Sequence, residues 1–182
     1  MMKIRLIATA ATGIALVAVA LTLGPGASAQ GAAAQAPAST ASQTTLSVGG
    51  DVPHPLSFTP ADIKAMPRIT VTVSEEGREV KYEGVLVGEL LKRAEAPIGR
   101  DLTGQAVASY VLCKAKDGYQ VVFSLPELDP AFTSNEIIVA DTIDGKPLFD
   151  YQGPLRIVAP HDKRGARSIR MVQSIDVVRL RK

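Results

Sequence analysis

The sequence predicts an α+β domain that is mainly β, with curled mixed sheets around one core and a few short helices. Segments rich in Val, Ile and Thr recur along the chain, about eight in all, and several alternate apolar with polar residues as half-buried strands do. Turn-forming pairs such as Asp117-Gly118 and Asp144-Gly145 separate them. Roughly two or three segments show helical character, and each is short. Helices this few and this brief do not suit a doubly wound parallel sheet, so the pattern favours the α+β class.

The first part of the domain is expected to contain a strand and a short capped helix. Residues 45–48 alternate in character and predict a strand. Thr59 is a good N-cap residue, Pro60 suits the first helical position, and Asp62 places a negative charge at the positive end of the helix dipole. Pro67 must end this helix, because the residue before a proline disfavours helical backbone.

A hairpin and an amphipathic helix are expected next. Residues 69–73 form a β-branched alternating run, and residues 79–82 return after a polar turn. The period then changes, because apolar residues at 87, 90, 91 and 94 share one face of a helix over 85–94. The remaining expected elements are strands at 107–114, 119–123, 137–140, 155–158 and 168–180, and a brief helix that starts at Ser124.

The N-terminal residues have the three-part pattern of a secretory signal peptide. A basic start is followed by an apolar run over residues 6–23 and by the small-residue pattern Ala27-Ser28-Ala29. A retained membrane anchor is the alternative, since the run approaches the ~20 residues that a membrane span requires. Cleavage is favoured, so we expect a secreted or periplasmic protein with no stable membrane span after cleavage. The expected divisions are a signal peptide at 1–29, a flexible linker at 30–43 and the domain at 44–182.

Charge is balanced in the expected mature chain. The full sequence has 20 basic and 18 acidic residues, and loss of Lys3 and Arg5 with the signal peptide leaves 18 of each. Proteins that bind nucleic acid usually carry a basic excess, so we expect no nucleic-acid partner. An anionic ligand must therefore be held by a local group of basic side chains rather than by the overall field.

Cys113 is the only cysteine in the sequence, so no intramolecular disulfide is possible. It lies in an apolar stretch, and we expect it to be a buried structural residue. A metal ligand, a reactive thiol and an intermolecular bridge are the alternatives. The two histidines, His54 and His161, are far apart and do not give the spacing of a zinc site. We therefore assign no metal ligand and no catalytic residue from the sequence.

Basic side chains are concentrated in one stretch beyond residue 155. Arg156 lies in an apolar segment, Pro160 ends that segment, and a basic loop follows. Arginine forks suit the geometry of phosphate, and a loop that leaves one strand and enters a neighbouring strand brings its two ends together. The residues expected to line an anion site are Arg156, His161, Arg167, Ser168 and Arg170. A solvated basic loop is the alternative.

Two further side chains have open assignments. Arg156 needs a partner, because an unpaired charge in an apolar strand is costly. That partner is either an internal carboxylate such as Asp144 or Asp150, or a bound anion. Tyr119 follows a turn, and packing against the sheet is favoured over a place in a pocket.

Four segments are notable for their order and spacing. They are Tyr82-Glu-Gly-Val-Leu-Val-Gly-Glu-Leu-Leu91, Asp117-Gly-Tyr119 with Phe123-Ser-Leu-Pro-Glu-Leu128, Ile137-Ile-Val-Ala140 with Asp144-Gly-Lys-Pro-Leu148, and Gly153-Pro-Leu-Arg-Ile-Val-Ala-Pro160 with Gly165-Ala-Arg-Ser-Ile-Arg170. Together they resemble the oxidoreductase molybdopterin-binding domain of the sulfite oxidase superfamily. The resemblance implies a sulfite-oxidase-like fold, and the length and expected signal peptide would make this chain a short, exported, single-domain member.

The resemblance also implies a cofactor and a partner. Molybdopterin carries a phosphate that needs cationic and backbone donors, while the metal on its dithiolene does the redox work. The five candidate residues fall in the segment with which the family contacts this cofactor. A protein partner would then exchange electrons with the domain.

The sequence departs from the family pattern at the metal. Members that carry out redox chemistry bind molybdenum through a cysteine placed before the segment that begins at Tyr82, and residues 69–74 contain no cysteine. Cys113 does not match by order, and a thiolate is the soft ligand that would fix the metal. The family's closing Val-Lys-Trp is replaced by Ile169-Arg170-Met171.

Two functions therefore stay open. The first is an exported molybdopterin-binding, oxidoreductase-like domain that lacks the usual molybdenum-ligating cysteine. The second is a non-catalytic exported module that binds an anionic small molecule or a protein partner. A hydrolase is not indicated, because the sequence has no Gly-x-Ser-x-Gly motif.

Overall fold

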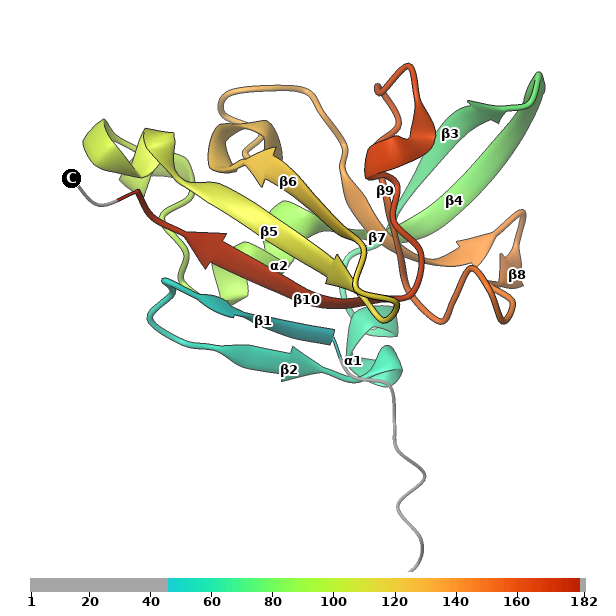
Figure 1. Cartoon of the computed structure of the whole chain (residues 1–182), viewed down its shortest axis with the longest axis horizontal. Coiled ribbons are helices and arrows are strands. Elements are labelled where there is room, and N and C mark those ends of the chain that lie inside the picture. Colours follow the sequence, from blue (N-terminus) through green and yellow to red (C-terminus); the bar gives the residue numbers. More distant parts are fainter. Residues whose placement is uncertain (1–45, 181–182) are drawn as a thin grey trace, which may run out of the picture. The chain divides into compact units, whose positions relative to one another are not determined.

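Ten strands in two sheets form the framework of the part of the chain that a computed structural model describes, residues 46–180 (Figure 1). The expected signal peptide and linker lie outside the described residues. The first sheet has the order β2-β1-β10-β5-β6, with β1 (Leu46–Gly50), β2 (Leu56–Phe58), β5 (Tyr110–Ala115), β6 (Gln120–Ser124) and β10 (Val172–Val178). The second has the order β3-β4-β7-β8 with β9 also paired to β7, and comprises β3 (Ile69–Glu75), β4 (Arg78–Leu86), β7 (Ile138–Ile143), β8 (Lys146–Pro147) and β9 (Arg156–Val158).

The helices of the described residues are short, as expected. They are α1 (Pro60–Lys64), α2 (Val87–Arg93) and the 3-10 turns η1 (Gly99–Asp101), η2 (Gly104–Ala108), η3 (Leu125–Leu128) and η4 (Gly165–Arg167). The predicted start of α1 is confirmed, since Thr59 Oγ1 accepts a hydrogen bond from Asp62 N–H and the Asp62 carboxylate accepts one from Thr59 N–H. Between residues 46 and 180, no helix has both the length and the apolar character that a bilayer crossing requires.

The strand pairing confirms the predicted class of mainly β structure with mixed sheets. β1 and β10 pair in parallel, whereas the other paired strands are antiparallel. The β3–β4 hairpin turns at Glu76-Gly77, and the β5–β6 hairpin turns at Asp117-Gly118, both where the sequence predicts a turn. β4 continues through Leu86, so the helix predicted over 85–94 begins later, at Val87.

Two predicted strand starts are wrong by more than one residue, and one short strand was not predicted. The strand expected from 107 begins only at Tyr110, because the positive φ of Gly104 (56°) starts the tight turn η2 instead. The strand expected from 168 begins at Val172, because Met171 has a positive φ of 48° that breaks the extended backbone. β2 was not expected, since a strand of three residues carries too little pattern to be recognised.

The apolar residues form two clusters on opposite faces of the second sheet. The larger cluster joins both sheets and α2, whose Val87, Leu90 and Leu91 are buried in it. The smaller cluster contains Tyr82 of β4 and alternate residues of β7 and β9. Arg156 lies two residues before Val158 of that smaller cluster and opposite Ala140 in the ladder, so it is on the same face as Tyr82.

Candidate functional site

A pocket of about 360 Å³ lies where the loop after β9 meets the β5–β6 hairpin. Its lining consists of Ala115, Asp117, Tyr119, Arg156, Gly165, Ala166, Ser168, Ile169 and Arg170. Three of the five residues expected to bind an anion, Arg156, Ser168 and Arg170, are therefore brought together. Arg167 and His161 are not in the lining.

Arg156 is held in a buried polar cluster. Its side chain donates from Nη1 to Tyr82 Oη at 2.6 Å and to Gln152 Oε1 at 2.9 Å, and from Nη2 to Glu75 Oε1 at 3.0 Å. Tyr82 Oη also donates to Glu75 Oε1 at 3.0 Å. Burial raises the pKa of Tyr82 to about 12, although the nearby positive charge of Arg156 opposes the change. The phenol therefore stays a neutral donor and acceptor at physiological pH.

The internal partner of Arg156 is Glu75, so the two carboxylates proposed from the sequence were wrong candidates. Asp144 instead accepts a hydrogen bond from Lys81 N–H at 3.0 Å in the turn before β8. No local pattern favours Glu75, which is 81 positions away from Arg156 and reaches it only because β3 and β9 lie in one sheet. One atom of the guanidinium remains without a partner, because Arg156 Nε is buried and forms no hydrogen bond with a described residue.

Ser168 and Arg170 supply the other polar groups of the pocket. Ser168 Oγ accepts a hydrogen bond from Ala159 N–H at 3.1 Å, which leaves its own hydroxyl hydrogen free to be donated. The Arg170 guanidinium is exposed and stacks over the ring of Tyr151, 5.2 Å from the ring centroid. Within residues 46–180, no carboxylate forms an ion pair with Arg170. Its charge is available to a ligand.

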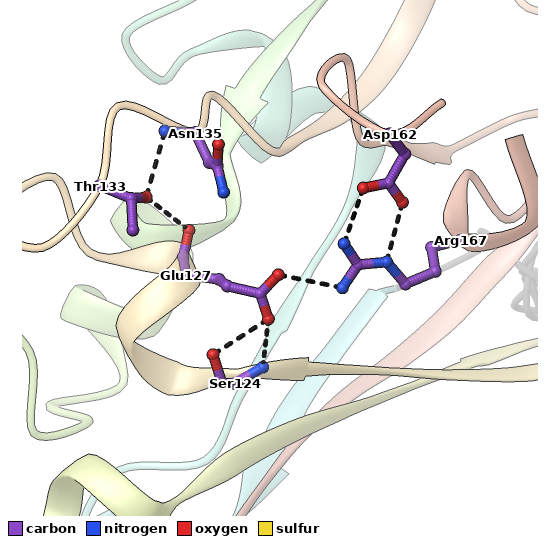
Figure 2. A network of polar contacts seen from close by, with 6 residues as sticks. All are labelled: Ser124, Glu127, Thr133, Asn135, Asp162 and Arg167. Carbon is purple, nitrogen blue, oxygen red and sulfur yellow. Dashed lines mark hydrogen bonds and ion pairs between the residues drawn. The ribbon is translucent and has the colours of Figure 1, made fainter. Parts of the chain in front are cut away.

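Arg167 makes a different set of contacts, shown in Figure 2. It donates from Nε and Nη2 to the two carboxylate oxygens of Asp162, at 2.8 and 2.7 Å, and from Nη1 to Glu127 Oε1 at 3.1 Å. The guanidinium also lies over the ring of Phe123, 4.7 Å from the centroid. The hydrogen bonds to Asp162 have the largest effect in raising the pKa of Arg167, and the hydrogen bond to Glu127 adds to it. Arg167 thus ties the basic loop to η3 rather than facing the pocket.

Glu127 is the junction of that network. Its carboxylate accepts hydrogen bonds from both Ser124 N–H and Ser124 Oγ, which completes the capping box predicted at this turn. Burial raises the pKa of Glu127, but the hydrogen bonds from Ser124 and Arg167 outweigh burial and hold the pKa below its ordinary value. Glu127 therefore remains ionised and paired at neutral pH.

His161 and its basic neighbours Lys163 and Arg164 are exposed on the loop. None of these side chains belongs to the pocket lining. For these three residues the arrangement matches a solvated basic loop, the alternative considered from the sequence.

Asp117 and Tyr119 line the pocket but were not assigned to it from the sequence. Tyr119 was expected to pack against the sheet, yet its side chain is 51% exposed and its Oη donates to Ala166 O at 3.1 Å. That hydrogen bond joins the β5–β6 hairpin to η4 and forms one wall of the pocket. Asp117 accepts from Tyr119 N–H and adds a negative charge to the lining, so two arginines face one carboxylate. The Asp117-Gly118-Tyr119 turn is the sequence feature that could have indicated a place for these two side chains in the pocket lining.

Cys113 is fully buried in β5, as expected. Burial raises the pKa of its thiol to about 12, so it remains protonated at neutral pH. Across residues 46–180, no three His, Cys, Asp or Glu side chains are grouped so that they could hold a metal ion.

Comparisons with known proteins identify the family. Residues 33–182 match the family model of the oxidoreductase molybdopterin binding domain. A search of curated proteins found no match. Among solved structures, the chain is similar to the sulfane dehydrogenase SoxCD from Paracoccus pantotrophus, with a TM-score of 0.58 and 18% sequence identity over 73% of this chain. The match covers 37% of the SoxCD chain, so this chain corresponds to only part of that protein. With most of its length matched by the family model, the chain belongs to the oxidoreductase molybdopterin binding domain family.

Proposed function

We propose that this domain binds a molybdopterin-type cofactor by its phosphate, in the pocket of Arg156, Ser168 and Arg170, and without a cysteine ligand to molybdenum. The observation that carries the proposal is Arg156 Nε, a buried donor without a partner among the described residues, on an arginine that lines the same pocket as Arg170. A buried donor of this kind is costly to leave unpaired, and an anion would satisfy it.

The residues present fit the anionic part of the cofactor. Arg170 provides a charge that no carboxylate among the described residues pairs with, and Ser168 provides a hydroxyl hydrogen. In this arrangement the phosphate would receive charge-assisted hydrogen bonds from two sides of the pocket.

The residues that fit the phosphate of the cofactor are not matched by a cysteine ligand for its metal. Cys113 is buried and protonated, and a metal requires the thiolate. We propose that Cys113 does not ligate molybdenum. A molybdopterin that carries the metal would supply oxidoreductase chemistry, and the chain's own residues would bind and orient the pterin.

The proposal is tested by purifying the protein from its native host and measuring molybdenum content together with pterin fluorescence after oxidation. Pterin near one equivalent per chain supports it, and the absence of pterin from a folded preparation counts against it. Arg170→Ala should lower pterin occupancy about tenfold, because a charge-assisted hydrogen bond contributes about 1.5–3 kcal/mol. Arg164→Ala is the matched control, since it removes an equal charge from an exposed position in the same loop.

A non-catalytic module for a smaller anion is the second candidate. The observation that favours it is the Glu75 carboxylate, which already occupies Nη2 of Arg156 and leaves fewer donors for a large ligand. Retention of inorganic phosphate or sulfate without pterin in the same preparation would support this candidate.

We also propose that the protein is exported and that a redox or other protein partner acts with it. The support for export is the basic start, apolar run and small-residue pattern of residues 1–29. N-terminal sequencing of the protein from its host should find Gln30 first. An intact Met1 on a membrane-bound protein would exclude cleavage.

A further inference from the structure

A second and larger cavity, of about 1050 Å³, shares no lining residue with the anion pocket. One wall is formed by α2 and η1, and the other by the segment from Leu128 to Ile137. The function proposed above makes no use of this groove.

The two walls of the groove are fastened to each other. Asp129 is buried and accepts hydrogen bonds from Gly99 N–H on one wall and from Ala131 N–H on the other. Gly88 brings α2 against the same segment, since a Cβ at this position would lie 2.5 Å from Leu128 O. The groove is therefore a formed feature of the fold and not a gap between loosely placed loops.

The floor of the groove is apolar. Leu128 and Ile137 are 5% and 4% exposed, and partly buried Ile98 packs beside the core. Phe132, in contrast, is 49% exposed within the lining. Phe132 therefore adds exposed apolar surface beside the buried floor, against which an apolar group of a ligand could pack.

The charge of the lining is mainly negative. The ionisable side chains are Glu89, Glu95, Asp101, Asp129 and Glu136 against the single base Lys92. Asp129 is used within the protein and Glu95 lies 3.4 Å from His54. Within the described part of the chain, Glu89, Asp101 and Glu136 form no ion pair. An acidic rim around an apolar floor is complementary to a ligand that is both cationic and apolar.

We propose that this groove binds a segment of a partner protein in which lysine or arginine alternates with apolar residues. The three unpaired carboxylates belong to α2, to η1 and to the segment 129–137, so they are spread over both walls. One small cation meets only one of them at a time, whereas a chain with several cationic side chains meets them together and places apolar side chains on Phe132. The proposal is independent of cofactor binding in the other pocket.

The test is fluorescence polarisation with a labelled peptide of alternating lysine and leucine, added to the full-length protein. Binding should weaken about tenfold in the double variant Glu89→Gln and Glu136→Gln, and about tenfold again with Phe132→Ala. The double variant Glu79→Gln and Glu83→Gln is the matched control, because it removes the same charge from β4 and should leave binding unchanged. Wild-type binding should also weaken as salt rises from about 0.01 M to about 1 M, where the Debye length falls from about 30 Å to about 3 Å.

Three outcomes would overturn the proposal. The first is no binding of the lysine–leucine peptide by the folded protein at low salt. The second is equal loss of binding in the Glu79 and Glu83 control, which would indicate attraction to net charge alone. The third is equally tight binding of lysine amide or spermidine, which would make the groove a site for small cations.

Discussion

Replacing Arg167 by alanine is expected to destabilise the domain by about 2 kcal/mol. The change removes three charge-assisted hydrogen bonds, to Asp162 and Glu127, and the contact with the Phe123 ring. Fully buried bonds of this type contribute about 1.5–3 kcal/mol each. The Arg167 side chain is 35% exposed, however, so water and salt screen much of that energy. Exposed ion pairs contribute about 0.2–1 kcal/mol each, and the ring contact adds roughly 0.5–1 kcal/mol.

Urea unfolding near neutral pH measures this loss as a lower midpoint with an unchanged slope. The melting temperature should fall by about 5–10 °C for a domain of this size. Arg164→Ala, in the same loop but exposed, should change stability by no more than about 0.5 kcal/mol.

The stability lost in the Arg167→Ala variant should depend on pH. The pKa of Glu127 is lower in the folded protein than in the unfolded chain, so Glu127 contributes stability that is fully present above its ordinary pKa of about 4.3. That stability is lost as the pH falls through the folded pKa. The stability difference between wild type and Arg167→Ala should therefore shrink as the pH falls below about 4. A difference that is near zero at neutral pH, or that is constant down to acid pH, would refute the reasoning.

Three further variants test other parts of the fold. Gly88→Ala should lower the free energy of unfolding by about 1–3 kcal/mol, because the new Cβ would lie 2.5 Å from the carbonyl oxygen of Leu128. An unchanged midpoint in urea would show that α2 can move away from Leu128. Arg68→Ala should cost about 1–3 kcal/mol, because the 5% exposed Asp141 carboxylate loses the two hydrogen bonds that Arg68 donates, at 3.1 and 2.6 Å, and keeps only the one from Thr142 Oγ1 among the described residues. The pKa of Asp141 is lowered in the folded protein, so the loss should be smaller in acid; equal loss at all pH values would contradict this. Cys113 should resist thiol reagents in the native protein, since its pKa is about 12, and Cys113→Ser should cost about 1 kcal/mol; rapid labelling of the folded protein would contradict its burial.

The elements that could be predicted from the sequence are those whose signal is local. The helix cap at Thr59 and Asp62 and the turns at Asp117-Gly118 and Asp144-Gly145 depend on residues within three or four positions of one another. Strand ends depend on less visible causes. Because the backbone of Met171 is left-handed, β10 begins only at Val172. The residues Ile169-Arg-Met-Val172 contain no glycine or asparagine that would indicate a positive φ.

The candidate site was predictable in part for the same reason. Ser168 and Arg170 lie close in sequence to the end of β9, so their place near Arg156 follows from the loop that joins them. The role of Arg167 does not follow, because its partner Glu127 is 40 positions away on another element. The pairing of Arg156 with Glu75 likewise requires knowledge of which strands are neighbours. Ion pairs between residues far apart in the sequence cannot be predicted from the local sequence around either residue.

The position of β10 has a consequence for how the domain can fold. β10 is the last strand of the described chain, yet it lies in the middle of its sheet, between β1 from the beginning of the domain and β5. The parallel pair of Ser47 with Ser174 joins residues more than a hundred positions apart, and loop closure over such a span slows folding. Until residues near 178 have left the ribosome, β1 and β5 each present an open edge and the core between the sheets stays incomplete. The first sheet can therefore be completed only once β10 is available, and removal of β10 would divide the sheet into the pairs β2–β1 and β5–β6 rather than trim its edge.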